Sequence, residues 1–433
     1  MAPELSRRRL LTGGTVAAAG LLGGATFLPS GFLPDGVAVA RTWYRPIPDI
    51  EWRPPVTATH AEASRNLLRD TVTRAEHDLD AVGSVDDSAT GVAPERALDE
   101  ARDHLGDAAG TADWETLRDV RNGLDAAGRA IGGVRLAAGT ASGEHLATQA
   151  RTIQEELARA SDRISYRVAD PSRGLARLYW AERWLSLGLL HTYRNGTYAG
   201  QEEPTTEYDD YSLISTWGSH MQARGYALDA KHLAADYRDS VGDAADRTDH
   251  VEAVAASLQD GARTAKPGLE AQDRREETLR AIPDGTRRTF EWQQFRAKIA
   301  ANVFFDRGPW AGVPLYRAVT NAEALLVCRG ADAALARSDL GRGDEVTPSM
   351  LDQAKRTALR LLDERLTTPR TPSLLALLAR EPRRLLRAGD SELEPDPERD
   401  HQRARAYGKY LRAVGYLRAL PDVVAWVTGS DTS

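Results

Sequence analysis

Apolar residues recur at steps of three and four along most of the chain after residue 58. Leu68, Val72, Ala75, Leu79 and Val82 follow this spacing, and further runs at 98–108, 117–134 and 146–164 do the same. Because an α-helix turns once every 3.6 residues, this spacing gives each run one apolar face. The pattern predicts four successive amphipathic helices between residues 58 and 170.

The breaks between these runs carry residues that end helices. Gly83, residues 91–94, residues 110–111, residues 139–143 and the pair Asp170-Pro171 separate the apolar runs. Short links between long helices place consecutive helices side by side and antiparallel. We therefore expect residues 58–170 to form an antiparallel four-helix bundle, and an intermolecular coiled coil is the alternative.

The rest of the chain, residues 171–433, also has a helical pattern, but its segments are apolar on more of their surface. No run alternates apolar and polar residues over the length of a strand, so the predicted fold class is all-α, with the bundle followed by a larger multi-helical domain. The expected helices span residues 172–194, 209–240, 244–264, 268–282, 286–307, 312–338, 348–367, 372–388 and 396–420.

Residues 41–57 differ from both regions because they contain Pro46, Pro48, Pro54 and Pro55. Proline removes a backbone donor and fixes φ, so this density excludes a helix and predicts an extended strap. Trp43, Tyr44 and Trp52 are expected to hold the strap against the folded body.

The first 40 residues are interpreted as a targeting signal. Arg7 and Arg8 precede two leucines, no charged residue lies between Leu10 and Leu33, and Ala38-Val39-Ala40 offers small residues for a signal peptidase. This arrangement resembles a twin-arginine export signal. A retained membrane helix is the alternative, since the apolar run is long enough to cross a bilayer. Contact with a membrane is expected only if the signal is uncleaved.

Two further features agree with an extracytoplasmic destination for a chain that folds before export. Cys328 is the only cysteine, so folding needs no disulfide. Asn195-Gly196-Thr197 is a glycosylation sequon, which makes Asn195 a candidate for modification.

Charge excludes one class of partner. Charged residues make up 27% of the chain and the net charge is −7, so no basic excess exists to neutralise nucleic acid phosphates. Lysine occurs only at positions 231, 266, 298, 355 and 409. Few lysines with many aspartates suit a salt-rich environment, although a high genomic GC content also favours arginine and alanine.

Tyrosine and tryptophan are concentrated between residues 179 and 226, where phenylalanine is absent. Rings with a polar edge are common where a protein binds a hydrated ligand, and aromatic platforms beside carboxylates are typical of sugar sites. Ordinary packing between helices is the competing interpretation. The candidate ligand-binding residues are Trp180, Trp184, His191, Tyr193, Tyr208, Asp209, Asp210, Trp217 and His220.

Standard catalytic and metal signatures are missing from the sequence. It has no Walker A loop, no GxGxxG, no HExxH and no CxxC. We expect no metal and no cofactor, and Cys328 is expected to be a buried structural thiol. Residues 371–389 combine leucines with Arg380, Arg383, Arg384 and Arg387; this suggests a core helix with an exposed basic end, and a membrane-surface helix is the alternative.

Together these features favour an exported, soluble helical protein that binds or scaffolds an unknown partner, or a glycan, at the cell surface. An extracytoplasmic all-α enzyme acting on glycans is the alternative, and no residue can be assigned a catalytic role. A cofactor-carrying protein with His191 or His220 as ligand is a third possibility.

Overall fold

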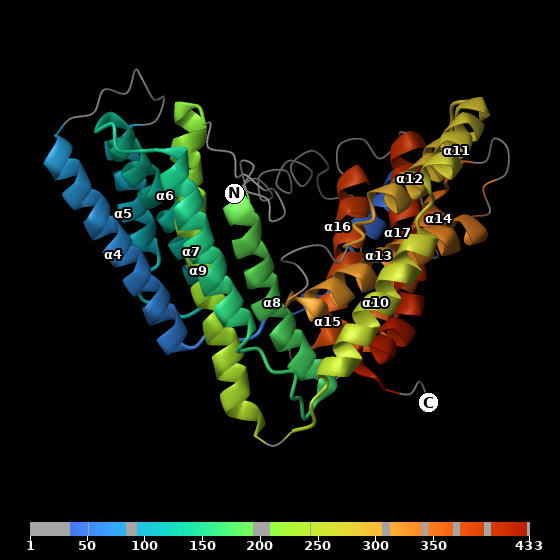
Figure 1. The fold of residues 1–433 in the computed structure, drawn as a ribbon. Helices are drawn as coiled ribbons and strands as arrows, with labels where there is room; N and C mark the ends of the chain where they lie inside the picture. The colour runs from blue at the N-terminus through green and yellow to red at the C-terminus, as the bar shows by residue number, and fades with distance from the viewer. Residues whose placement is uncertain are drawn as a thin grey trace, which may run out of the picture.

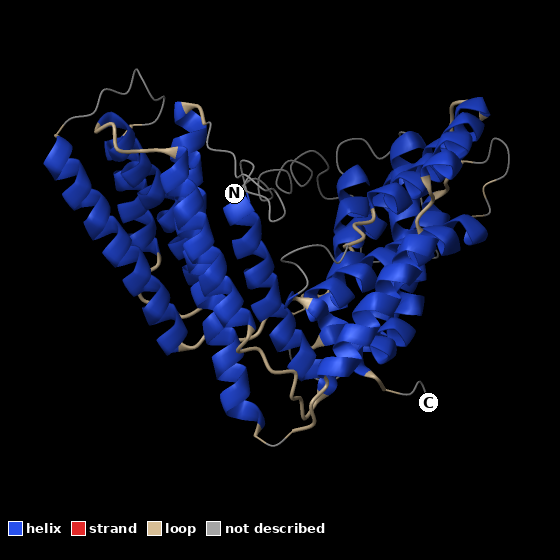
Figure 2. Cartoon of the chain, viewed as in Figure 1, coloured by secondary structure: helices blue, strands red, loops and turns tan. Residues whose placement is uncertain are grey.

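A computed structural model describes residues 35–50, 52–83, 93–193, 208–242, 244–304, 312–338, 340, 345–366, 373–393 and 400–430. The named elements in these residues are all α-helices (Figure 2), which confirms the predicted all-α class. They are α3 (Asp35–Trp43), α4 (Ala58–Val82), α5 (Pro94–Asp107), α6 (Trp114–Ala137), α7 (Gly143–Ser161), α8 (Pro171–Tyr193), α9 (Asp210–Val241), α10 (Thr248–Ala265), α11 (Leu269–Ala281), α12 (Thr286–Ala300), α13 (Pro314–Arg337), α14 (Pro348–Leu366), α15 (Leu374–Leu378), α16 (Arg380–Leu393) and α17 (Asp400–Thr428).

The helices form two groups that diverge from a common base, as the two sides of a V (Figure 1). We call α4–α9 the N-terminal arm and α10–α17 the C-terminal arm. Helix α8 lies on the inner side of the N-terminal arm and packs against α13, α15 and α17 of the other arm. The inner face of α8 is therefore where the two arms meet.

In the N-terminal arm, α6 and α9 form the central pair. Helix α6 packs against α9, α5 and α4, whereas α7 packs against α9 and α8. Residues 58–170 supply the four predicted helices, but those helices do not close into a bundle by themselves because α9 lies among them. Apolar patterning identifies the buried face of each helix without naming the helix that covers it.

Glycine allows α6 and α9 to approach closely. A Cβ atom added to Gly128 would lie 2.7 Å from the carbonyl oxygen of Trp217 and 2.8 Å from the Cα of Gly218. These distances are shorter than ordinary van der Waals contacts, so the two helix backbones are too close to leave room for a side chain at Gly128. The small residue is thus required by the helix pairing.

A buried carboxyl group joins the two arms. Glu182 of α8 is fully buried, and its Oε2 accepts a hydrogen bond from the backbone N–H of Tyr316 at 2.6 Å, in the first turn of α13. The phenolic hydroxyl of Tyr166 donates to the other carboxyl oxygen. Burial raises the pKa of Glu182 to about 8, although both hydrogen bonds act in the opposite direction.

Helix α3 belongs to the folded body and packs against α14 and α16. Ala38 and Val39 are buried, and the buried Lys355 donates from Nζ to the carbonyl oxygens of Thr42 at 2.8 Å and Trp43 at 3.2 Å. The cation thereby satisfies carbonyl groups that the end of a helix leaves without partners. It also forms an ion pair with Asp390 at 2.8 Å.

This helix corrects the predicted start of the strap. The extended strap is predicted to begin at residue 41, but the helix continues through Trp43, and residues 35–40, which belong to the predicted export segment, form its first part. The physical reason is that the prolines begin only at Pro46, so nothing upstream prevents helix formation. Arg7, Arg8 and Asn195 lie outside the described residues.

Several helices of the C-terminal arm also differ from their predicted extents, and α17 continues through Pro421 to Thr428, past the predicted end at residue 420. The segment predicted as one helix at 372–388 is divided at Ala379 into α15 and α16. Pro382 explains the division, because its ring clashes with a preceding turn and is tolerated only in the first turn of a new helix. Helix α12 ends at Ala300, short of the predicted residue 307. Among the described residues, no helix has the length and apolar character needed to cross a membrane.

Candidate functional site

Trp180, the first of the predicted binding residues, lies in the core between α8 and the strap. Its side chain is 2% exposed and its ring stacks on Trp52 with centroids 5.1 Å apart. Its Nε1 donates to the carbonyl oxygen of Trp52 at 3.1 Å, and the ring of Trp114 lies 4.9 Å away. These contacts hold the strap against α8, so the face predicted to bind a ligand is occupied by the protein itself.

Trp184 and His191 take part in packing between α8 and α9. The Trp184 ring stacks with Tyr226 at 5.3 Å, and the Arg121 guanidinium lies 4.4 Å from the centre of the Trp184 ring. The ring of His191 lies 5.3 Å from that of Tyr226. Arg121 also pairs with the buried Asp229. This group is a buried aromatic and ionic cluster.

The other predicted residues lie at separate places along α8 and α9. Tyr193 is buried, which raises its pKa to about 12. Tyr208 is partly buried against the core of the N-terminal arm. Asp209 caps α9 by accepting a hydrogen bond from the backbone N–H of Ser212 at 2.6 Å, which lowers its pKa, and Asp210 is exposed in the first turn.

Trp217 and His220 both belong to the interior of the N-terminal arm. Trp217 is 1% exposed and carries the Arg135 guanidinium 4.8 Å from its ring centre. His220 Nδ1 lies 3.0 Å from Gln149 Oε1, and burial lowers the pKa of His220 to about 4. The described residues contain no group of three or more histidine, cysteine, aspartate or glutamate side chains arranged to hold a metal.

The structure therefore does not gather the predicted residues around one cavity. Packing between helices accounts for the buried tryptophans, Tyr193 and His220, whereas Asp209 caps α9 and Asp210 is exposed. The neighbouring Glu202, Glu203 and Glu207 lie outside the described residues.

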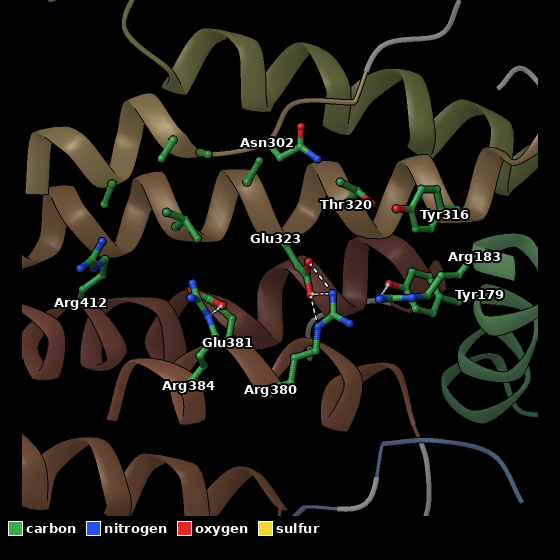
Figure 3. Close-up of a pocket in the computed structure, with 15 residues that line it drawn as sticks. Tyr179, Arg183, Asn302, Tyr316, Thr320, Glu323, Arg380, Glu381, Arg384 and Arg412 are labelled. Atoms are coloured by element: carbon green, nitrogen blue, oxygen red, sulfur yellow. Dashed lines mark hydrogen bonds and ion pairs between the residues drawn. The ribbon is translucent and has the colours of Figure 1, made fainter. Parts of the chain in front are cut away.

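A different set of residues lines a pocket between the two arms (Figure 3). We call it the arginine pocket; its volume is about 380 Å³, within the range of roughly 300–1,000 Å³ typical of small-molecule sites. Helices α8, α12, α13, α16 and α17 contribute to its walls. The lining residues are Tyr179, Arg183, Ala297, Ala300, Ala301, Asn302, Tyr316, Thr320, Glu323, Ala324, Val327, Arg380, Glu381, Arg384 and Arg412.

Two of the four arginines are held by carboxylates in bidentate pairs, drawn as dashed lines in Figure 3. Arg380 donates from Nε and Nη2 to the two oxygens of Glu323 at 2.8 and 2.9 Å. Arg384 makes the same kind of pair with Glu381, at 2.7 Å for both bonds. The guanidinium and carboxylate groups share a planar fork, so these pairs fix the position of each arginine.

Arg412 of α17 has no such pair. Its side chain is 8% exposed, and its Nε has no hydrogen-bond partner among the described residues. Burial lowers its pKa to about 10; Glu381 raises this pKa, and Arg384 lowers it. Because Glu381 is already bound to Arg384, Arg412 lies in a polar pocket as a buried cation with no carboxylate of its own.

Arg183 is the fourth cation of the arginine pocket. Its Nη1 donates to the hydroxyl oxygen of Tyr179 at 3.2 Å, one helical turn earlier, and its Nε has no hydrogen-bond partner among the described residues. With two carboxylates against four guanidinium groups, the lining carries an excess of two positive charges. Such a site attracts and orients an anion, and its Arg groups suit carboxylate or phosphate oxygens.

The remaining walls are of two kinds. Hydroxyl and amide groups come from Tyr316, Thr320 and Asn302, and a small apolar surface comes from five residues: Ala297, Ala300, Ala301, Ala324 and Val327. Both carboxylates are engaged by arginine, so neither is a free general base. The arrangement is suited to holding a ligand rather than to proton transfer.

Sequence reasoning missed this site, although it noted Arg380 and Arg384 as the basic end of a helix. The available signal was their i, i+4 spacing, which places both on one helix face, together with the i, i+4 pair Tyr179 and Arg183. No sequence pattern indicates that these two faces meet, because one lies on α8 and the other on α16.

The described part of the protein is thus helical and has a basic pocket between its two arms. Two family models match the chain, and each is described as a domain of unknown function: DUF8262 matches residues 59–244 and DUF8264 matches residues 248–429. The matches divide the chain between α9 and α10, whereas the sequence analysis divides it after residue 170. No curated protein and no solved structure matches the chain. Tyr179 and Arg183 lie in the first matched region and the other pocket residues in the second.

Proposed function

We propose that this chain is a non-catalytic binding protein that holds an anionic ligand in the arginine pocket. The observation that carries the proposal is Arg412, a cation 8% exposed whose Nε has no partner among the described residues, facing a pocket with an excess of positive charge. Burying a charge without a partner is costly, so a fold that keeps one is expected to gain from the anion that completes it.

The proposal includes an extracytoplasmic location at the cell surface. The Arg7-Arg8 motif supports this location. The single cysteine, Cys328, also supports it, because a chain that forms no internal disulfide can fold before export. The scarcity of lysine supports a salt-rich setting, which unfolding in low and in molar KCl would test. A glycan-active enzyme has less support, because Asp209 serves as a helix cap and both pocket carboxylates are bound by arginine.

The test measures binding of simple anions. Phosphate, sulfate, citrate and galacturonate are titrated calorimetrically, with neutral galactose as the uncharged control. We expect at least one of these anions to bind, and Arg412→Gln to weaken it about 10- to 100-fold, because a charge-assisted hydrogen bond contributes roughly 1.5–3 kcal/mol.

Arg412→Lys, which keeps the charge, should recover part of that loss. Arg329→Gln is the matched control, since Arg329 is exposed on α13 and does not line the pocket. Arg183→Gln supplies a second, less buried variant in case Arg412→Gln fails to fold. Equal binding by the wild-type protein and both pocket variants would refute the proposal.

A further inference from the structure

The arginine pocket continues into the strap through two shared guanidinium groups. Arg380, which lines the pocket, also lies 5.4 Å from the ring centre of Trp52 in the strap. Arg183 lies 5.1 Å from the ring centre of Trp180, which stacks on Trp52. The Trp52 cluster therefore borders the pocket through Arg380 and Arg183.

Arg53 lies beside Trp52, outside the set of residues that line the pocket. It is exposed, and its guanidinium carbon lies 4.9 Å from the ring centre of Trp52, 5.5 Å from that of Trp114 and 5.9 Å from that of Trp180. Three aromatic rings hold the guanidinium in place, which reduces the entropy lost when a ligand binds to it. No ion pair joins Arg53 to a carboxylate among the described residues.

The charges near Arg53 are also positive. Burial lowers its pKa, followed by the cations Arg183, Arg121, Arg118 and Arg380. Arg118, Arg121 and Arg380 are paired with carboxylates, whereas Arg53, Arg183 and Arg412 have no ion pair among the described residues. These unpaired guanidinium groups favour a ligand with more than one negative charge along its length.

We propose that the ligand is an acidic oligosaccharide, with one uronate-type ring in the arginine pocket and the carboxylate of a later ring on Arg53. This inference rests on the proposed function and specifies its ligand. Uronate rings carry carboxylates, hydroxyls and an apolar C–H face, which suit the guanidinium, hydroxyl and alanine groups that line successive parts of the pocket, with Arg412 at one end and Tyr316 at the other (Figure 3).

The composition of the pocket favours a sugar over other polyanions. The alanine wall, Ala297, Ala300 and Ala324, gives the apolar face of a ring a surface on which to lie, which a bare phosphate chain does not need. Single-stranded nucleic acid binds through bases stacked on open aromatic faces. Trp52 offers no such face, because Trp180 and two guanidinium groups cover its ring.

The experiment compares galacturonate with its linear tetramer on the full chain. For the wild-type protein we expect the tetramer to bind at least about 10-fold more tightly than the monomer, because a second charge-assisted contact becomes intramolecular. Arg53→Gln should reduce the tetramer-to-monomer ratio of affinities to below about 3-fold. Arg412→Gln should weaken both ligands and leave the ratio near its wild-type value.

Three outcomes would overturn the inference. They are a ratio near one in the wild-type protein, a ratio unchanged by Arg53→Gln, and tighter binding of polyphosphate or single-stranded DNA of matched charge. In each case binding of a simple anion that depends on Arg412 would still support the proposed function. Loss of all anion binding would refute both. Arg173→Gln, an exposed arginine near the start of α8 outside the pocket, is the surface-charge control.

Discussion

Arg412 is a guanidinium that the fold buries without a matching carboxylate. Its Cγ packs 3.2 Å from the position that a Cβ on Gly330 would take, so the aliphatic part of the side chain is well placed in the core. The charged end, by contrast, costs free energy when no anion is bound. Binding and stability therefore make opposite demands on this residue.

We predict that Arg412→Met stabilises the ligand-free protein by about 1–3 kcal/mol while it abolishes anion binding, because replacing an unpaired buried charge with an apolar side chain removes a desolvation cost. Urea denaturation in an anion-poor buffer measures the free energy of unfolding. A lower stability for Arg412→Met would mean that the guanidinium has an internal structural role. Arg329→Met serves as the exposed control.

At the residue scale, the binding residues predicted from the sequence and the arginine pocket lie in different parts of the molecule. Trp180 and Trp217 have the type of ring expected on a binding surface. Both rings are buried, however, and the residues one turn away on the same helix face also belong to the core. Arg183 lies in α8, far in sequence from Arg380 in α16 and Arg412 in α17. Their convergence depends on how α8 packs against the C-terminal arm, and no local spacing encodes that.

At the element scale, the pairing of α6 with α9 depends on backbone contact at Gly128. We predict that Gly128→Ala lowers the free energy of unfolding by roughly 2–4 kcal/mol, because the new methyl group would overlap the backbone of Trp217 and Gly218. The loss should exceed the small gain in helix propensity, which is about 1 kcal/mol.

Gly106→Ala is the matched control for this substitution. Gly106 also lies within a helix, α5, but a Cβ there would meet nothing within 4 Å. Its replacement should stabilise the protein by up to about 1 kcal/mol through helix propensity alone. Thermal and urea unfolding of both variants would measure the contrast, and equal effects would argue against the close approach of α6 and α9.

Helix α3 bears on where the proposed export signal would be cleaved. A protein that folds before export presents its folded form to a signal peptidase, yet Ala38 and Val39 are buried in α3 and Lys355 holds the end of that helix. If the chain is exported as proposed, we therefore expect the N-terminus of the processed protein to precede Asp35. Intact-mass measurement of protein recovered from outside the cytoplasm tests this, and an N-terminus at Arg41 would contradict it.

Most helices could be predicted from the chain, because the signals that start and stop them are local. Pro94 and Pro314 lie in first turns, and Thr57, Asp113 and Ser142 cap the helices that follow them. The arrangement of the helices could not be predicted. Helix α9 has no single apolar face, so its sequence does not indicate that it lies among the helices of residues 58–170.

At the scale of the whole molecule, Glu182 makes the junction between the arms sensitive to pH. Its pKa of about 8 in the folded protein exceeds the value of 4.5 for an unperturbed carboxyl group. Between these values the folded state binds a proton that the unfolded state has released, so this group's contribution to stability falls as the pH rises from about 4.5 to 8 and then levels off.

We predict that Glu182→Gln removes this dependence, because glutamine does not ionise. The variant should be less stable than the wild-type protein at pH 5. The difference in their free energies of unfolding should narrow by roughly several kcal/mol between pH 5 and pH 9. Urea unfolding at pH 5, 7 and 9 supplies the free energies. Glu252→Gln is the control, and a constant difference for Glu182→Gln across this range would contradict the prediction.

The position of the arginine pocket between the two arms has a mechanical consequence. Because Arg183 comes from one arm and Arg384 from the other, the width of the pocket depends on the angle of the V. An anion that bridges these two groups would draw the arms together, and by thermodynamic reciprocity any load that spreads the arms would loosen the anion. The affinity for the anion would then depend on forces that change the angle between the arms, because α8 both lines the pocket and packs against the C-terminal arm.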